Sequence, residues 1–314
     1  MARSAVRRGA IPPSPLLACA VLGSSLMASC AGWGPRAQQD QPLLVVTTVL
    51  PISEFTRAVA GNCATVQPLI PTNVGPHDFQ ARPSDVARVG QADVLVKNGL
   101  GLETFLDKLI ASAGNTRLKV IDSSRGITTL PNPGEGGINP HIWLDPLLAE
   151  QQVNTIRDGL IAARPACKEQ FTANAAAYTA QLRSLNAELA AQLKPYAGKS
   201  FVVYHDFHPY FAQRYGLQGT FVVDVPDENP TPADLRRVAT AAQKSQLKAL
   251  LAEPQEGGRS FSALAKDLDV TVGEFDSIET GPDSAQQPTA YFEVMRRNGQ
   301  ALVRAFGGPS QGAR

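Results

Sequence analysis

The sequence predicts an α/β protein of two lobes, each a mainly parallel four-stranded sheet with flanking helices, joined by a long rigid backbone helix. Short, nearly continuous apolar runs alternate with helical stretches in both halves of the chain. A long helical region with heptad-like spacing separates the halves. With 314 residues, of which 43% are hydrophobic, the chain can bury two cores.

The first half contains four short runs rich in β-branched residues, which are typical of buried parallel strands. Helical stretches at Ser53–Ala60 and Leu102–Ala111 lie between them. The alternation of strand and helix predicts a parallel sheet covered on both faces. The expected strands are Leu43–Thr48, Val66–Leu69, Val94–Lys97 and Lys119–Ile121.

The middle of the chain predicts two long helices. Asp145 followed by Pro146 is a favourable start, because Asp caps the free amides and Pro fits the first helical position. Pro165 should interrupt this helix. A second apolar series then recurs at intervals of three, four and seven until Pro195 and Gly198 end it. Its members are Phe171, Tyr178, Leu182, Leu185, Leu189 and Leu193.

The second half repeats the pattern of the first, with helices expected at Pro232–Lys244 and Ser260–Leu268. The resulting division has a first lobe over residues 42–145, linking helices over 146–197 and a second lobe over 198–314. The strands expected in the second lobe are Phe201–Tyr204, Thr220–Val223, Ala249–Ala252 and Val270–Phe275.

The N-terminus has the pattern of an export signal. Three arginines precede an apolar stretch, Leu16 to Ala28, that is too short to span a membrane. Leu-Met-Ala-Ser-Cys at 26–30 resembles a bacterial lipoprotein box with a lipid on Cys30, and a plain cleaved signal is the alternative. We expect a signal peptide over 1–29, a polar tether over 30–41, and a periplasmic or extracellular location at the membrane surface.

Cysteine usage and charge agree with an exported carrier. Once Cys19 is cleaved off and Cys30 is lipidated, Cys63 and Cys167 remain; a disulfide is favoured over two free thiols. The formal net charge of the chain is +1, which gives no indication of a nucleic-acid partner. We expect a monomer.

The four histidines of the chain are the most informative candidates for chemistry. His77 follows the second expected strand, His141 enters the long helix, and His205 directly follows the strand Phe201–Tyr204. Asp276 follows the strand Val270–Phe275. In open α/β sheets, ligands bind beyond the carboxyl ends of strands. Three imidazoles and one carboxylate can complete a tetrahedral shell around Zn²⁺, although each histidine could separately be an ordinary polar loop residue.

The same residues lie in segments that resemble the zinc/manganese-binding solute proteins of ABC importers, the ZnuA/TroA-like family. The resemblance extends from Val45 to about Phe306. The most specific blocks are LIPTNVGPHDFQARPSDVARVGQADVLVKNGLGLETFLDKL, NPHIWLDP, FVVYHDFHPYFAQRYGL and VGEFDSIET. This resemblance implies an extracytoplasmic solute-binding protein that carries a divalent metal ion to a membrane permease of the ABC type.

Matched position by position, the family pattern implies His77, His141, His205 and Asp276 as metal ligands. Ser277 stands where the family usually has proline after the aspartate. The pattern does not require His208, which we expect near the cleft or on the surface and not on the metal. Glu253 matches a family acid near the site; it could orient a histidine or simply begin a helix.

The choice of metal stays open between zinc and manganese. Three nitrogen donors favour zinc, whereas manganese prefers more oxygen. The loop from Ser123 to Gly137 lacks the histidines found there in many zinc-uptake members. A surface adhesin of the same fold is another alternative. A zinc hydrolase, with Glu253 as base, is disfavoured, because catalytic zinc usually keeps an open position that four protein donors would fill; we expect no enzyme.

Overall fold

A computed structural model describes residues 41–132, 137–225, 230–254 and 258–309. The expected signal peptide, tether and Cys30 lie outside these residues, apart from Gln41. The described residues from Pro42 onward form one compact unit. Among the helices of the described part, even the longest lacks the run of apolar residues needed to cross a bilayer.

The first lobe is built on a parallel sheet with strand order β2-β1-β3-β4. Both faces of this sheet are covered, since Val45 and Val94 contribute to one apolar cluster and Val46 and Leu95 to another. Strictly alternating side chains therefore bury both faces, as expected for parallel strands. The strands are β1 (Leu43–Thr47), β2 (Ala64–Pro68), β3 (Val94–Lys97) and β4 (Lys119–Asp122); the helices are α1 (Leu50–Ala60), α2 (Pro83–Gln91) and α3 (Leu106–Ala113).

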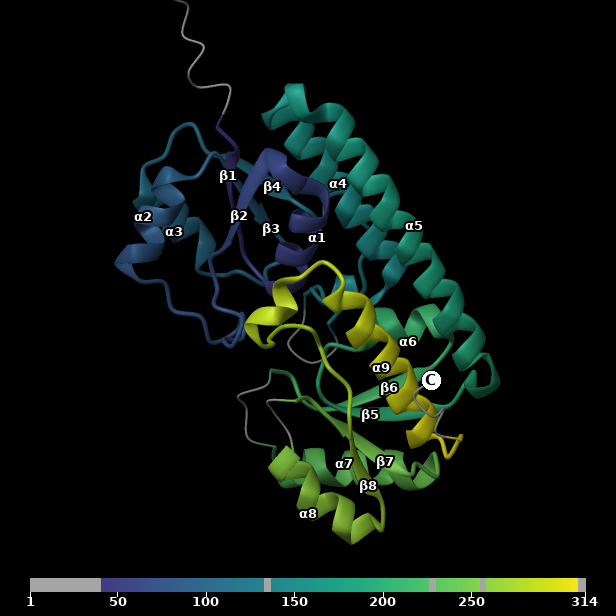
Figure 1. Ribbon diagram of the computed structural model, residues 1–314. Coiled ribbons are helices and arrows are strands. Elements are labelled where there is room, and N and C mark those ends of the chain that lie inside the picture. Colours follow the sequence, from purple (N-terminus) through teal and green to yellow (C-terminus); the bar gives the residue numbers. More distant parts are fainter. Residues whose placement is uncertain (1–40, 133–136, 226–229, 255–257, 310–314) are drawn as a thin grey trace, which may run out of the picture. The chain divides into compact units, whose positions relative to one another are not determined.

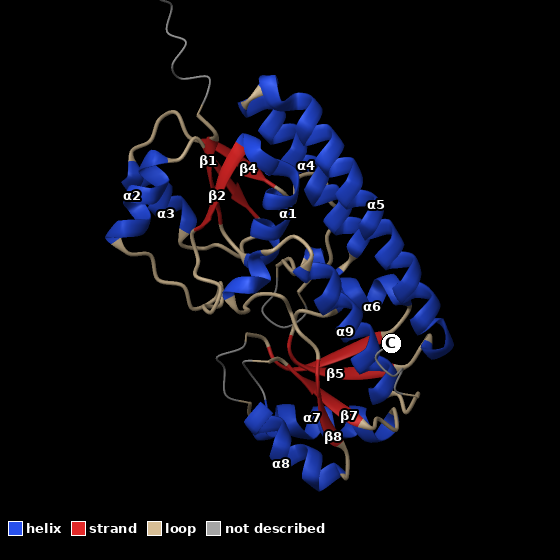
Figure 2. Ribbon diagram, in the orientation of Figure 1, coloured by secondary structure: helices blue, strands red, loops and turns tan. Residues whose placement is uncertain are grey.

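The second lobe repeats this topology with strand order β6-β5-β7-β8, again all parallel (Figures 1 and 2). The strand order is the same in both lobes, so β1 and β3 are neighbours at the centre of the first sheet, as β5 and β7 are in the second. The strands are β5 (Ser200–His205), β6 (Gln218–Val223), β7 (Ala249–Ala252) and β8 (Thr271–Glu274); the helices are α6 (Pro209–Tyr215), α7 (Pro232–Lys244), α8 (Gly258–Leu268) and α9 (Ala290–Ala305).

Two long helices pack against the lobes, the first of them beside the first lobe and the second along both (Figure 1). Helix α4 (Pro146–Ala163) begins as expected, with the Asp145 side chain accepting the Leu147 amide at 2.8 Å. The chain turns at Pro165, and α5 (Lys168–Leu193) continues for 26 residues, about 39 Å at 1.5 Å per residue. Its buried apolar seam contacts α1 of the first lobe and α9 of the second. The expected fold class is therefore confirmed.

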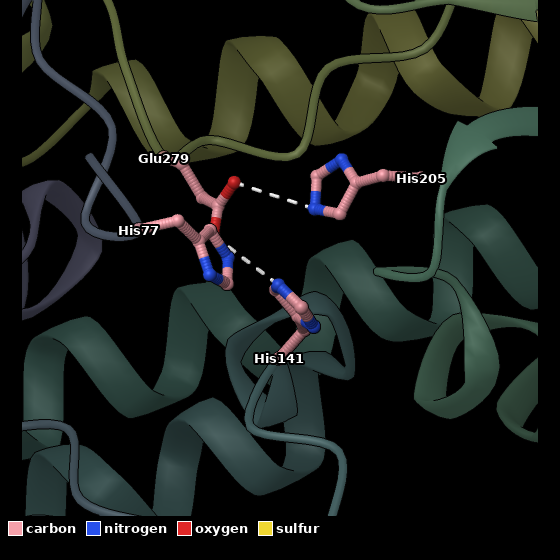
Figure 3. Close-up of side chains that lie close together, drawn as sticks. All are labelled: His77, His141, His205 and Glu279. Atoms are coloured by element: carbon pink, nitrogen blue, oxygen red, sulfur yellow. Dashed lines mark hydrogen bonds and ion pairs between the residues drawn. The ribbon is translucent and has the colours of Figure 1, made fainter. Parts of the chain in front are cut away.

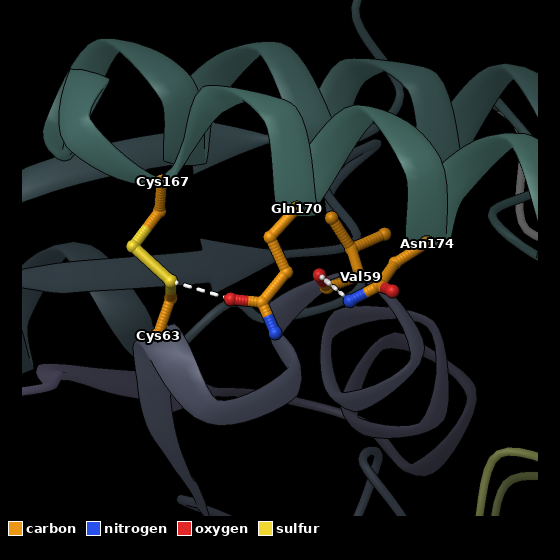
Figure 4. Close-up of a disulfide and its surroundings, with 5 residues drawn as sticks. All are labelled: Val59, Cys63, Cys167, Gln170 and Asn174. Atoms are coloured by element: carbon orange, nitrogen blue, oxygen red, sulfur yellow. Dashed lines mark hydrogen bonds between the residues drawn. A yellow bond between two sulfur atoms is a disulfide. The ribbon is translucent and has the colours of Figure 1, made fainter.

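A disulfide joins Cys63, at the end of the turn after α1, to Cys167, just before α5 (Figure 4). The two Cα atoms are 6.3 Å apart, across 104 residues of sequence. Gln170 Oε1 lies 2.8 Å from the Cys63 sulfur; because a disulfide sulfur carries no proton, this is a packing contact and not a hydrogen bond. Asn174 of α5 donates to the Val59 carbonyl at 3.1 Å, so α1 and α5 are held at two adjacent points.

Candidate metal centre

Four side chains converge between the two lobes: His77, His141, His205 and Glu279 (Figure 3). Each offers one ligand atom, and these atoms all lie within 4.8 Å of one another. Two come from the first lobe, from the loop after β2 and the turn before α4; two come from the second, from the end of β5 and the segment after β8. Only the His77 side chain is appreciably exposed, at 20%.

The three imidazoles present the same nitrogen to one carboxylate. The Nε2 atoms of His77 and His141 lie 3.3 and 3.2 Å from Glu279 Oε1, and Nε2 of His205 lies 3.4 Å from Oε2. A tetrahedral zinc shell with bonds of ~2.0–2.2 Å has donor–donor edges of roughly 3.3–3.5 Å. The two separations to Oε1 therefore already match the edges of such a shell, and His205 faces the second oxygen of the same carboxylate.

Glu253 fixes the orientation of His205. The Nδ1 atom of His205 lies 2.5 Å from Glu253 Oε1, with both side chains buried. This contact keeps one proton on Nδ1, so Nε2 is the nitrogen that faces the metal position and must release its proton when a metal binds. Burial lowers the pKa of His205, but the carboxylates of Glu253 and Glu279 outweigh that effect and raise it to about 9. Glu253 thus orients a histidine; it does not simply begin a helix.

Asn139 plays the corresponding part for His141. Its Oδ1 accepts both the His141 main-chain amide at 3.1 Å and the His141 Nδ1–H at 3.0 Å. Its Nδ2 donates to the carbonyl of Asp206, next to His205, at 2.7 Å. One amide side chain therefore fixes the His141 ring and ties it to the end of β5 in the other lobe. Burial lowers the pKa of His141 to about 4, so this ring is neutral and ready to bind a metal.

Glu279 supplies the negative charge of the site. Burial alone would raise its pKa, but the nearby imidazoles, with His77 and His205 as the largest contributors, hold the pKa of Glu279 well below its ordinary value. The chain segment around Glu279 is hydrogen-bonded to the first lobe through its own main-chain groups. Trp143 Nε1 donates to the Ser277 carbonyl at 2.8 Å, and the Gly281 amide donates to the Thr72 carbonyl at 2.7 Å.

Asp276, the expected fourth ligand, is not part of this group, and Glu279 occupies its place. The Asp276 Oδ1 accepts the Ile278 amide at 2.8 Å, and its main chain exchanges two hydrogen bonds with the Asn298 side chain. Ile278 has a φ of +65°, which is strained for a β-branched residue. Asp276 therefore builds the tight turn that carries the chain onward to Glu279.

The sequence contains one signal for Glu279. It is the next acid after Asp276 in the segment that follows β8, within the same family-like block. A glutamate reaches one methylene further than an aspartate, so it can serve a site that lies farther from the strand end. Which of the two acids faces the histidines depends on the Ile278 turn, which spacing does not reveal.

His208 lies outside the group of ligands, and it is buried, not on the surface. Its Nδ1 lies 3.3 Å from Asp206 Oδ1, and its ring is hydrogen-bonded to the main chain of Gly219. A Cβ at Gly219 would collide with the ring, so a glycine is required in β6 at this point. Burial lowers the pKa of His208 to about 3. This histidine belongs to the packing of the second lobe.

The fold has two α/β lobes joined by long helices, and each lobe supplies two of four possible metal ligands. These features define a two-lobed binding protein with a candidate metal centre. Residues 45–305 match the family model described as zinc-uptake complex component A, periplasmic (ZnuA). The match spans most of the chain, and the chain belongs to this family.

Relatives and solved structures support this assignment. The chain is 27% identical over 295 residues to the high-affinity zinc uptake system protein ZnuA of Bacillus subtilis, covering 88% of this chain and 92% of that protein. It is 27% identical to the manganese-binding lipoprotein MntA of Halalkalibacterium halodurans, covering 88% and 93%. The Zn(II)-bound ZnuA-like domain of Streptococcus pneumoniae AdcA superimposes with a TM-score of 0.74 at 32% identity, covering 85% and 99%; the match covers 59% of the longer AdcA chain.

Proposed function

We propose that this protein is the extracytoplasmic solute-binding component of an ABC importer and that its cargo is Zn²⁺. The ion would bind to Nε2 of His77, His141 and His205 and to the Glu279 carboxylate. The observation that carries the proposal is the set of three nitrogen–oxygen separations of 3.2–3.4 Å around one carboxylate. The two separations that share Oε1 fit the edges of a tetrahedral zinc shell, and the third brings His205 to the same carboxylate.

The donor set favours zinc over manganese. Three imidazoles and one carboxylate supply more nitrogen than manganese prefers, and manganese usually takes an octahedral shell rich in oxygen. Asp276, which would add a second carboxylate, is engaged in the turn at Ile278. Manganese remains the alternative cargo, and it would require further oxygen donors at this centre.

The arrangement supports capture and release of a cargo. Four protein donors complete a tetrahedral shell and leave no position for a reactive water, which a zinc hydrolase needs. Each lobe provides two donors, so the ion binds best when both lobes are in the arrangement that brings the donors together. The metal then stabilises this arrangement by its differential affinity for it, and the permease can recognise the loaded form.

The export features extend the proposal to the cell surface. A disulfide between Cys63 and Cys167 suits an oxidising compartment. We place the mature chain outside the cytoplasm, anchored through a lipid on Cys30 and acting as a monomer with a membrane permease as its partner.

The direct test is zinc affinity, measured by competition with a chromogenic chelator, for His141→Ala and for the matched control His208→Gln. Removal of one of the four ligands should weaken binding by roughly 100-fold or more, since structural zinc sites are worth about 10–16 kcal/mol in total. The control should bind zinc like the unmodified chain, because His208 lies outside the centre. Equal affinities for all three proteins would refute the site. Tighter binding of Mn²⁺ than of Zn²⁺ would favour the alternative cargo.

A further inference from the structure

Tyr210 of helix α6 is a residue of the second lobe that packs into an apolar cluster on the side of the first lobe. Among the described residues, the other members of this cluster all precede it in the chain, in the first lobe or at the start of α4. Tyr210 is only 2% exposed, and a buried tyrosine usually needs a partner for its hydroxyl group. The other members are Ile127 and Ile142, with Leu100, Leu130 and Leu148 packed against them.

The hydroxyl group of Tyr210 joins two segments of the first lobe. It accepts the Leu130 amide at 3.0 Å and donates to the Asn139 carbonyl at 2.8 Å. Leu130 and Asn139 also contact each other, because the Asn139 amide donates to the Leu130 carbonyl at 3.0 Å. The hydroxyl group therefore uses both its donor and its acceptor capacity where the two segments meet.

Asn139 is 0% exposed, and each of its four polar groups has a partner. Its amide binds Leu130, and its side-chain oxygen accepts from the main chain and the ring of His141. Its carbonyl accepts from Tyr210, and its side-chain nitrogen donates to the carbonyl of Asp206. Two groups of Asn139 are thus held by the first lobe and two by the segment that follows β5.

Arg214 makes a second contact from the same face of α6. It follows Tyr210 by four residues, which is about one helical turn. Its Nε donates to both carboxylate oxygens of Asp145 at 2.8 Å, and Asp145 caps the start of α4. Helix α6 is therefore held at two points, and the position of the Tyr210 ring relative to α4 is fixed.

We propose that Tyr210 is a positioning residue of the metal centre: its hydroxyl group holds Asn139 where the Asn139 side chain orients the His141 ring. Tyr210 lies outside the group of ligands and acts through Asn139. Helix α6 begins four residues after His205, so the same contact sets the distance between two donors from different lobes. The centres of the His141 and His205 rings are 5.3 Å apart (Figure 3).

A tyrosine that only holds the lobes together would behave differently. Loss of its hydroxyl group would lower the stability of the fold and leave zinc affinity unchanged. Tyr215 of the same helix provides the comparison, since it is also buried and its hydroxyl group donates to Asn186 of α5 at 3.4 Å. The effect on zinc rests on the proposed function, whereas the contact of Tyr210 with Leu130 and Asn139 does not.

The first test is zinc affinity, measured by chelator competition. Tyr210→Phe keeps the ring in its cluster and should raise the zinc dissociation constant about tenfold, the lower end of the range for residues that support a ligand. The matched control Tyr215→Phe should bind zinc like the unmodified chain. The double variant Tyr210→Phe with Asn139→Ala should bind no more weakly than Asn139→Ala alone, because both changes act through one side chain. Unchanged affinity of Tyr210→Phe, or losses that multiply in the double variant, would overturn the proposal.

The second test needs no metal. Hydrogen exchange of the zinc-free full chain, followed by NMR, measures how often the amides of Leu130, Asn139 and His141 open. Exchange should be about fivefold faster in Tyr210→Phe than in Tyr215→Phe, the factor that corresponds to one hydrogen bond. Equal exchange in the two variants would refute the positioning of Asn139 by Tyr210. If the unmodified chain failed to bind zinc, the proposed function would fall, and this exchange result would still decide the role of Tyr210.

Discussion

Removing the charge of Glu279 and of Asp276 in separate variants tests which of the two acids is the metal ligand and which only builds the turn. Glu279→Gln removes the carboxylate that faces three imidazoles at 3.2–3.4 Å. Asp276→Asn keeps the Oδ1 acceptor that the Ile278 amide uses. Both changes are nearly isosteric, so each alters charge with little change in volume.

The expected magnitudes differ widely. If a structural zinc site is worth about 10–16 kcal/mol over four ligands, one ligand accounts for roughly 3–4 kcal/mol, or at least ~100-fold in dissociation constant. Glu279→Gln should lose about this much, because the amide is a far weaker zinc ligand than the carboxylate. Asp276→Asn should lose no more than about tenfold, the lower end of the range for residues that support a metal site, because the turn keeps its acceptor for the Ile278 amide.

Chelator competition at one pH, with zinc and both variants, measures the two losses side by side. A circular dichroism melt of the zinc-free proteins shows whether either fold has changed. The opposite ranking, with Asp276→Asn losing far more affinity than Glu279→Gln, would refute the assignment of the fourth ligand and restore Asp276 to that role.

Four further predictions follow from the same contacts. Glu253→Gln should weaken zinc binding by about 10–100-fold, because the amide no longer holds the proton on His205 Nδ1; chelator competition measures it, and unchanged affinity would contradict it. Asn139→Ala should cost a similar factor and speed zinc release in stopped-flow, whereas an unaltered release rate would exclude its positioning role. Since the pKa of His205 is raised to about 9, zinc must displace roughly one proton near pH 7. Zinc affinity should therefore rise about tenfold per pH unit up to about pH 9. Calorimetry in buffers of different ionisation enthalpy measures the proton release, and its absence would contradict this prediction. Replacing Cys63 and Cys167 with alanine should lower unfolding free energy by about 2–4 kcal/mol in urea melts with little effect on zinc affinity, and an unchanged midpoint would count against the disulfide.

Much of the fold could be predicted from local patterns. Each of the eight expected strands appears within about two residues of its predicted bounds, because short, nearly continuous apolar runs that alternate with helical stretches are typical of buried parallel strands. The start of α4 followed from Asp145 and Pro146, and its end from Pro165. These signals are local, so they can be recognised without knowing which distant residues each element packs against.

Helices α2 and α9 were harder to predict because their buried residues are partly polar. Helix α2 buries Val89 together with Asp85, so its apolar face is too narrow to give a clear period. In α9, Asn298 and Gly299 interrupt the apolar series. Asn298 is buried because it binds the main chain of Asp276, a contact between distant segments that periodicity cannot reveal.

The candidate site shows the same division between local and distant information. Three histidines at strand ends and loops could be selected from position and chemistry, and all three converge in the structure. The choice between Asp276 and Glu279 depends on the backbone turn at Ile278 and on the contact between Trp143 and Ser277. The turn is set by contacts of Asp276 with Ile278 and Asn298, and the Trp143 contact forms only when the two lobes are folded against each other.

The central claim is that one zinc ion is held jointly by residues of both lobes. Diffraction from zinc-loaded crystals, recorded at and below the zinc absorption edge, locates the metal without reference to any assumed ligand. The account predicts a single anomalous peak at ~2.0–2.2 Å from Nε2 of the three histidines and from a Glu279 oxygen. A peak bonded to Asp276 in place of Glu279, or one held by residues of a single lobe, would contradict it.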